Sequence, residues 1–226
     1  CHSFIGGGCF NVITGTLGST YNTLTGGYRN TICGGSSCQG QFIGGGALNV
    51  TSAPYATILG GSNNLSEYTH ATVVGGSNNR TLASYSVIVG GSNNLTNGSC
   101  STISGGTNNT NSGILSSIGG GRTNTISSTG NCSFIGGGQE NNIACGIYTT
   151  IAGGNCNTAA ANGITIAGGQ RNSGSAQFST IGGGFCNSSY GDFSTIVGGR
   201  EHIIEGGCSF IGVDKVIVRQ IHKVAL

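Results

Sequence analysis

Acidic residues and histidines are the first candidates for chemistry, because paired carboxylates or a positioned histidine perform general acid and base catalysis. The acidic residues are Glu67, Glu140, Asp192, Glu201, Glu205 and Asp214, and the histidines are His2, His70, His202 and His222. No two acidic residues occupy the same repeat position in adjacent repeats, and the two aspartates are too few for a calcium-binding roll. We therefore expect no enzyme activity, no metal site and no cofactor.

Cysteine is the next reactive residue type. The ten cysteines are Cys1, Cys9, Cys33, Cys38, Cys100, Cys132, Cys145, Cys156, Cys186 and Cys208, with no C-x-x-C pair and no regular Cys/His zinc spacing. We interpret them mainly as disulfide-bonded residues of a protein outside the cytosol. Cys100 and Cys132 share a repeat position but are two repeats apart, beyond the Cα span of a disulfide. Pairing is therefore predicted between different positions, as for Cys33 with Cys38, or between chains.

Asparagine offers a third kind of chemistry, N-glycosylation, at eight Asn-x-Ser/Thr sequons. Three of them, at Asn97, Asn108 and Asn131, fall in loop-like stretches and are the favoured glycan sites. The other five fall at one repeat position, where we favour a buried structural role over a glycan: Asn49, Asn64, Asn79, Asn94 and Asn187.

A repeat of about 15 residues must position all these side chains. One pattern recurs along the chain: a β-branched residue, then any one residue, then Gly-Gly. Its spacing is 15 residues except once 17 and once 16, and its β-branched residues are Ile43, Ile58, Val73, Ile88, Ile103, Ile118, Ile135, Ile151, Ile166, Ile181 and Ile196. Before Ile43 the frame is looser, with Ile5 and Leu24 at spacings of 19. Such a period predicts a stack of similar coils.

Most coils have a small residue two positions before the repeat Ile, which strand alternation places on the same inward face as the Ile. Aromatic residues three positions before it and threonines one position before it are predicted to share the outward face. Six positions after it stands an Asn in twelve of thirteen coils, with His202 as the exception. Beyond the five sequon residues above, this column continues through Asn109, Asn124, Asn141, Asn157 and Asn172.

Stacked amides can bond to the coils on either side, so this column predicts an Asn ladder at a corner whose unusual backbone angles the Gly-Gly pair supplies. The predicted fold is all-β: a parallel β-solenoid, or β-roll, of about 13 to 14 coils over residues 1–212. Residues 213–226 lack the repeat and predict a capping or joining strand.

The run S-T-I-x-G-G-x-x-N, as in Ser179 to Asn187, resembles the head repeats of the YadA-like trimeric autotransporter adhesins and Gly/Asn-rich repeats of bacterial and viral fibre proteins. The resemblance covers nearly the whole chain. It implies a left-handed parallel β-roll, often trimeric, displayed outside the cell.

Composition narrows the function further. Only 14 residues are charged, which disfavours a nucleic-acid partner, and no long apolar run predicts membrane insertion. A start at Cys1 suggests a processed product or part of a longer protein. We expect a glycosylated structural fibre, outside the cell or on a cell or virion surface, that self-assembles head to tail. The alternative is a trimeric binding head for carbohydrate or a receptor, and ice binding comes third.

Overall fold

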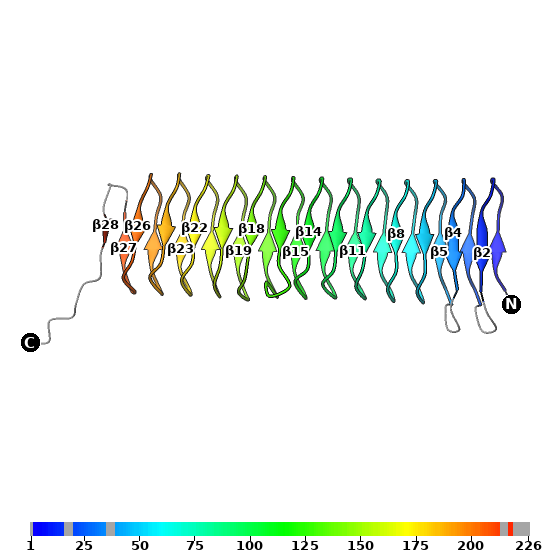
Figure 1. Cartoon of the computed structure of the whole chain (residues 1–226), viewed down its shortest axis with the longest axis horizontal. Coiled ribbons are helices and arrows are strands. Elements are labelled where there is room, and N and C mark those ends of the chain that lie inside the picture. Colours follow the sequence, from blue (N-terminus) through cyan, green and yellow to red (C-terminus); the bar gives the residue numbers. More distant parts are fainter. Residues whose placement is uncertain (1, 16–19, 35–38, 213–216, 219–226) are drawn as a thin grey trace, which may run out of the picture. The chain divides into compact units, whose positions relative to one another are not determined.

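The computed structural model describes residues 2–15, 20–34, 39–212 and 217–218. Every secondary-structure element in them is a short β-strand. The chain comprises two compact units, Cys1–Leu115 and Ser116–Leu226. Each unit is built from repeated coils (Figure 1).

The first unit contains two parallel sheets, to which successive strands contribute alternately. Its first sheet contains β1 (Phe4–Ile5), β3 (Thr23–Leu24), β5 (Phe42–Ile43), β7 (Thr57–Ile58), β9 (Thr72–Val73), β11 (Val87–Ile88) and β13 (Thr102–Ile103). Its second sheet contains β2 (Val12–Thr14), β4 (Thr31–Cys33), β6 (Val50–Thr51), β8 (Leu65–Ser66), β10 (Arg80–Thr81), β12 (Leu95–Thr96) and β14 (Thr110–Asn111).

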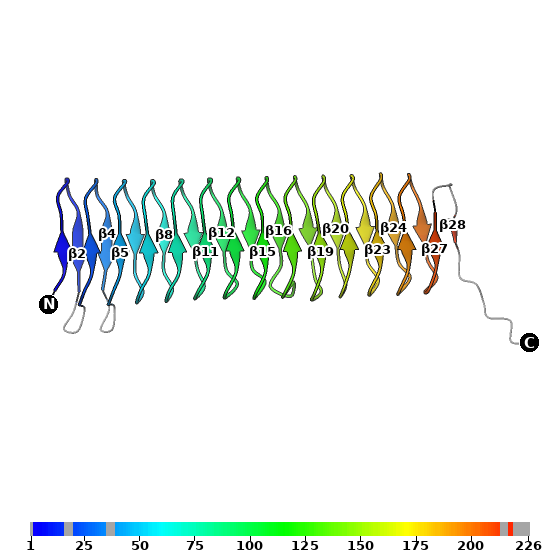
Figure 2. The same ribbon diagram turned by 180° about the vertical axis from the view of Figure 1, so that it is seen from behind.

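The second unit repeats this plan, as the reverse view in Figure 2 also shows. Its first sheet contains β15 (Ser117–Ile118), β17 (Phe134–Ile135), β19 (Thr150–Ile151), β21 (Thr165–Ile166), β23 (Thr180–Ile181), β25 (Thr195–Ile196) and β27 (Phe210–Ile211). Its second sheet contains β16 (Thr125–Ile126), β18 (Asn142–Ile143), β20 (Thr158–Ala159), β22 (Ser173–Gly174), β24 (Ser188–Ser189), β26 (Ile203–Ile204) and β28 (Ile217–Val218).

Each strand pairs in parallel with the equivalent strand of the next coil. In the first sheet Thr57 lies opposite Thr72, and Ile58 opposite Val73. The predicted fold is therefore confirmed: a parallel β-solenoid of about 13 turns, with about 15 residues in each.

The core is thin and is made of the predicted inward columns. The repeat residues from Leu24 to Ile196 have no exposed surface, and neither do the small residues Ala56 and Ala71 two positions before two of them. Ile and Val fill the space between the sheets, while the small residues let the chain turn beside them. Burial of one β-branched side chain per coil contributes about 2 kcal/mol, so stability accumulates coil by coil.

A second strand in each coil is the element that the sequence pattern did not reveal. It begins seven positions after the repeat Ile, and its second residue points inward, as Ser66, Thr81 and Thr96 do with no exposed surface. Ile32, which lies outside the regular frame, belongs to this second sheet, where it pairs with Ile13 and Thr51. Pairs such as Arg80–Thr81 or Ser173–Gly174 do not form a sequence pattern that predicts a β-strand.

Extra residues in the longer coils lie at a corner and leave the strand pairing intact. In the coil with spacing 17, the amide of Gly130 donates to the carbonyl of Ser127 and adds a turn. Ile118 still lies opposite Ile135. Residues 16–19 and 35–38, in the two 19-residue spacings, are outside the described residues.

Candidate functional site

The Asn ladder is the most regular side-chain array in the structure. Asn64 donates from Nδ2 to the carbonyl of Gly60 in its own coil, 3.1 Å away, and to the carbonyl of Gly76 in the next coil, 3.0 Å away. Its Oδ1 accepts the backbone N–H of Asn79 at 3.0 Å. Both amide hydrogens and the carbonyl oxygen are thus used, and the predicted ladder is confirmed.

The second glycine of each Gly-Gly pair provides the space for these amides. Gly91 has a φ of +84°, and a Cβ placed there would lie 2.1 Å from the carbonyl oxygen of Gly106 and 2.7 Å from Asn94 Nδ2. The first glycine, Gly90, has open space where a Cβ would stand. In this pair only the second glycine is therefore fixed by geometry.

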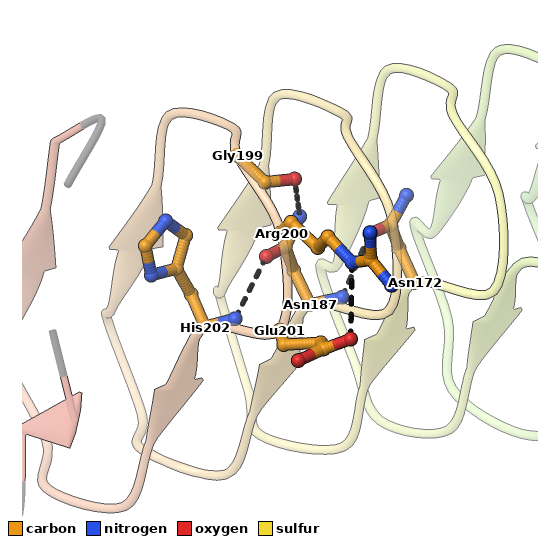
Figure 3. Close-up of polar contacts among 6 residues, drawn as sticks. All are labelled: Asn172, Asn187, Gly199, Arg200, Glu201 and His202. Atoms are coloured by element: carbon orange, nitrogen blue, oxygen red, sulfur yellow. Dashed lines mark hydrogen bonds and ion pairs between the residues drawn. The ribbon is translucent and has the colours of Figure 1, made fainter. Parts of the chain in front are cut away.

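His202 takes the ladder position at its C-terminal end (Figure 3). It is 1% exposed, and its backbone N–H donates to Asn187 Oδ1 at 3.0 Å as a ladder Asn would. A Cβ at Gly199 would lie 2.3 Å from His202 Nε2, where other coils have the amide nitrogen. The imidazole therefore fills the place of the carboxamide. The neighbouring ion pair, Arg200 Nε to Glu201 Oε1 at 3.0 Å, is exposed and adds little stability.

Each regular coil turns through two residues in the left-handed backbone region. One stands five positions after the repeat Ile. From Asn63 onward we call this set the polar corner column; it contains Asn63, Asn78, Asn93, Asn108, Thr123, Glu140, Cys156, Arg171, Cys186 and Glu201. Phe10, Arg29 and Leu48 precede it at the same position and in the same conformation. Asn tolerates this conformation better than other residues with a Cβ, so its use here matches the backbone.

The other left-handed residue stands three positions before the repeat Ile. We call this set the aromatic corner column; it contains Tyr55, His70, Tyr85, Cys100 and Leu115 in the first unit and Cys132, Tyr148, Phe178, Phe193 and Cys208 in the second. These residues are therefore corner residues rather than strand residues, since the strands begin two positions later at residues such as Thr57.

The rings of the aromatic corner column stack on one another and remain exposed. Ring centroids of Tyr55 and His70 are 4.7 Å apart, and those of His70 and Tyr85 are 4.9 Å apart. In the second unit Phe178 and Phe193 stack at 5.2 Å and are 53% and 62% exposed. The column forms an apolar ridge on each unit.

The sequons divide into buried and accessible sites. The five at ladder positions are at most 1% exposed. Asn97 and Asn108 are exposed, and Asn131 is partly exposed. Asn97 follows β12, and Asn108 lies in the polar corner column. The division follows the one predicted from the repeat; glycosylation itself stays a prediction.

Cysteines that the structure describes are all free thiols: Cys9, Cys33, Cys100, Cys132, Cys145, Cys156, Cys186 and Cys208. No disulfide joins any two of these eight residues within the chain, and the predicted pairing between chains stays a prediction. Cys1 and Cys38 are outside the described residues, so the Cys33–Cys38 pairing stays a prediction.

One thiol has a carboxylate partner. The Cys156 thiol donates to Glu140 Oε2 at 3.2 Å, and Gln139 Nε2 donates to Glu140 Oε1 at 2.8 Å. The bond from Gln139, followed by that from Cys156, lowers the pKa of Glu140. The bond to Glu140 raises the pKa of Cys156, because it stabilises the neutral thiol.

The remaining candidates for chemistry lie in separate places. His70 is in the aromatic corner column, His202 is in the ladder, and His2 stacks on Tyr21 at 5.7 Å. His222 and Asp214 lie outside the described residues. Within the part of the chain that the structure describes, no three His, Cys, Asp or Glu residues come together as metal ligands. The same residues form no helix long and apolar enough to cross a membrane.

No protein-family model and no curated protein sequence matches this chain.

Proposed function

We propose that this chain is a structural fibre protein of the cell exterior or of a cell or virion surface, without catalytic activity. One observation carries the proposal: the buried ladder Asn of one coil bonds to the next coil, and the array repeats along the chain. Asn79 is an example, since it bonds to Gly75 in its own coil and to Gly91 and Asn94 in the next. A protein whose repeated amides join each coil to the next is suited to extending a fibre.

Head-to-tail addition is the proposed mode of assembly. Ile217–Val218 pairs in parallel with Ile203–Ile204, although residues 213–226 lack the Gly-Gly repeat. The second sheet thus accepts a strand of unlike sequence at its edge. In the proposed joint, the edge of β28 that faces away from β26 pairs with β2 of another copy, and this contact does not close into a ring.

Electron microscopy of negatively stained protein tests the joint. The full chain is expected to form filaments, and a variant without residues 216–226 is expected to remain as single particles with an unchanged circular dichroism spectrum. Filaments of undiminished length from the truncated variant would contradict the joint.

A trimeric binding head like those of YadA-like adhesins is the second candidate, and the aromatic corner column favours it. The two corner columns share one backbone conformation, yet the polar corner column carries mainly Asn and charged residues, with Thr123, Cys156 and Cys186, while the aromatic corner column carries Tyr, Phe, His, Leu and Cys. Leu115 is 62% exposed and Tyr148 is 68% exposed, in a conformation that costs about 1 kcal/mol for such residues. A partner that buries these side chains would offset the cost of their exposure to water and the cost of their left-handed backbone conformation.

The matched test replaces ridge residues by Asn, which fits the same backbone. Tyr85→Asn and Phe193→Asn are expected to convert a trimer to a monomer in light-scattering chromatography without loss of folding. Asn93→Gly, in the polar corner column, is the control. A wild-type chain that is monomeric, or a trimer that survives both substitutions, would contradict the lateral contact.

A further inference from the structure

A groove of about 360 Å³ lies on the second sheet of the first unit. Its lining includes three residues from one strand column, Val50, Leu65 and Arg80, and three from the polar corner column, Asn63, Asn78 and Asn93. The groove therefore has an aliphatic floor that ends in a guanidinium, and one wall in which Leu48 is followed by a row of amides.

Part of the polar lining is available to a ligand, although Asn93 Nδ2 donates to Ser92 Oγ at 3.1 Å. Asn63 Nδ2 donates to Asn78 Oδ1, and among the described residues nothing accepts a bond from Asn78 Nδ2. Arg80 forms no ion pair with any described residue, and no acidic side chain lines the groove. A ligand with one negative charge would meet a cation that has no ion-pair partner among the described residues.

Backbone pairing is already complete along the groove, which limits the kind of ligand. The N–H of Arg80 donates to the carbonyl of Asn94, and the N–H of Asn78 donates to the carbonyl of Ser62. An extended peptide has no free strand edge to pair with at these positions, so β-strand addition is unavailable. The ligand must be held by side chains.

We infer that the groove binds an acidic sugar unit of a glycan. Carboxamides both donate and accept, as sugar hydroxyls do, and the planar guanidinium of Arg80 can bond a carboxylate through two N–H groups. The C–H face of a pyranose matches the aliphatic floor of Val50 and Leu65. The site is independent of the proposed assembly, because all of its lining comes from one unit of one chain.

The probe is a tri-galacturonate compared with its neutral methyl ester, with binding measured by calorimetry on the full chain produced without glycans. The acid is expected to bind at least about 10-fold more tightly than the ester, and Arg80→Gln is expected to remove this preference. Asn78→Gly keeps the left-handed corner and is expected to weaken both forms. Arg122→Gln removes an exposed arginine outside the groove and is expected to change nothing.

Equal affinity for acid and ester, or no binding of either, would overturn the assignment. Equal losses from Arg80→Gln and Arg122→Gln would show attraction to overall charge rather than to the groove. A tri-glutamate peptide that binds as tightly as the sugar acid would overturn the choice of carbohydrate. The variant without residues 216–226 is expected to bind normally, so failure of the filament and failure of this site are distinguishable.

Discussion

At the scale of single residues, the ladder asparagines are the most constrained polar groups in the protein. Each satisfies a carbonyl in its own corner and both a carbonyl and an N–H in the next coil, at a position closed to water. Loss of such an amide leaves buried partners without bonds, and this costs more than the bonds contribute when made.

Asn79→Ala is expected to destabilise the first unit by about 3 kcal/mol, because three hydrogen bonds disappear and their partners stay buried. Urea unfolding followed by circular dichroism measures the change. The adjacent exposed Asn78 supplies the control, and Asn78→Gly is expected to change stability by under about 0.5 kcal/mol. Similar losses of stability from the two substitutions would show that a buried ladder amide contributes no more than an exposed corner amide.

The Glu140–Cys156 contact sets the reactivity of one thiol. Because the carboxylate holds the pKa of Cys156 above its ordinary value, less thiolate forms at a given pH. Glu140→Asn keeps a residue suited to the left-handed corner and removes the charge. We expect faster alkylation of Cys156 by iodoacetamide at pH 8, measured by peptide mass spectrometry, with an unchanged rate at Cys186 in the same samples. An unchanged rate at Cys156 would refute the bond.

At the scale of elements, the corners rather than the strands carry the strictest geometry. The strands are mostly two residues long, so their pairing depends on how the corners return the chain to the same position in each coil. Two kinds of corner residue do this: the second glycine of each pair and the left-handed residues with a Cβ.

Adjacent glycines give a matched test of the corner. Gly91→Ala places a methyl against the Gly106 carbonyl and the ladder amide and is expected to cost at least about 3 kcal/mol. Gly90→Ala, one residue away, enters open space and is expected to be nearly neutral. The midpoints of chemical unfolding compare the two variants. The explanation fails if Gly90→Ala is as destabilising as Gly91→Ala.

Thr123 is a β-branched residue at φ +56°, the conformation least suited to it. Thr123→Asn is expected to raise stability by about 1 kcal/mol, because Asn occupies this position without the same strain. A thermal melt of the second unit records the gain. Thr150→Asn, on a strand of the same unit, is the control and is expected to lower stability. A loss at both positions would show that the corner imposes no strain.

At the scale of the whole molecule, few charges and many exposed apolar side chains have to be reconciled with solubility. The chain has 14 charged residues among 226, and apolar ridges lie exposed on both units. Glycans on accessible asparagines would shield such a surface.

N-glycosylation is therefore expected at Asn97, Asn108 and Asn131 when the chain passes through a secretory pathway that attaches N-glycans. The ladder sequons, at most 1% exposed, are expected to stay unmodified in the folded protein. Intact mass before and after enzymatic deglycosylation counts the glycans, and peptide mapping places them. Glycans at Asn64 or Asn79 would mean that modification precedes folding of those coils.

The sequence alone determined the period, the inward Ile column and the Asn ladder. A β-branched residue, a Gly-Gly pair and an Asn that recur together about every 15 residues favour stacked coils, and stacking buries the Ile and Asn columns. The sequence did not reveal the second strand of each coil, because residues such as Arg80–Thr81 acquire their strand conformation from the coils on either side.

Only the tertiary structure decided the left-handed corners, the exposed stacking of the aromatic corner column and the groove beside Arg80. Alternation along an extended chain placed the aromatic residues on a strand face, but closing a coil between two sheets turns the backbone at that position. The groove combines corner residues and strand residues of several coils, and their proximity follows from how the coils stack rather than from any local pattern.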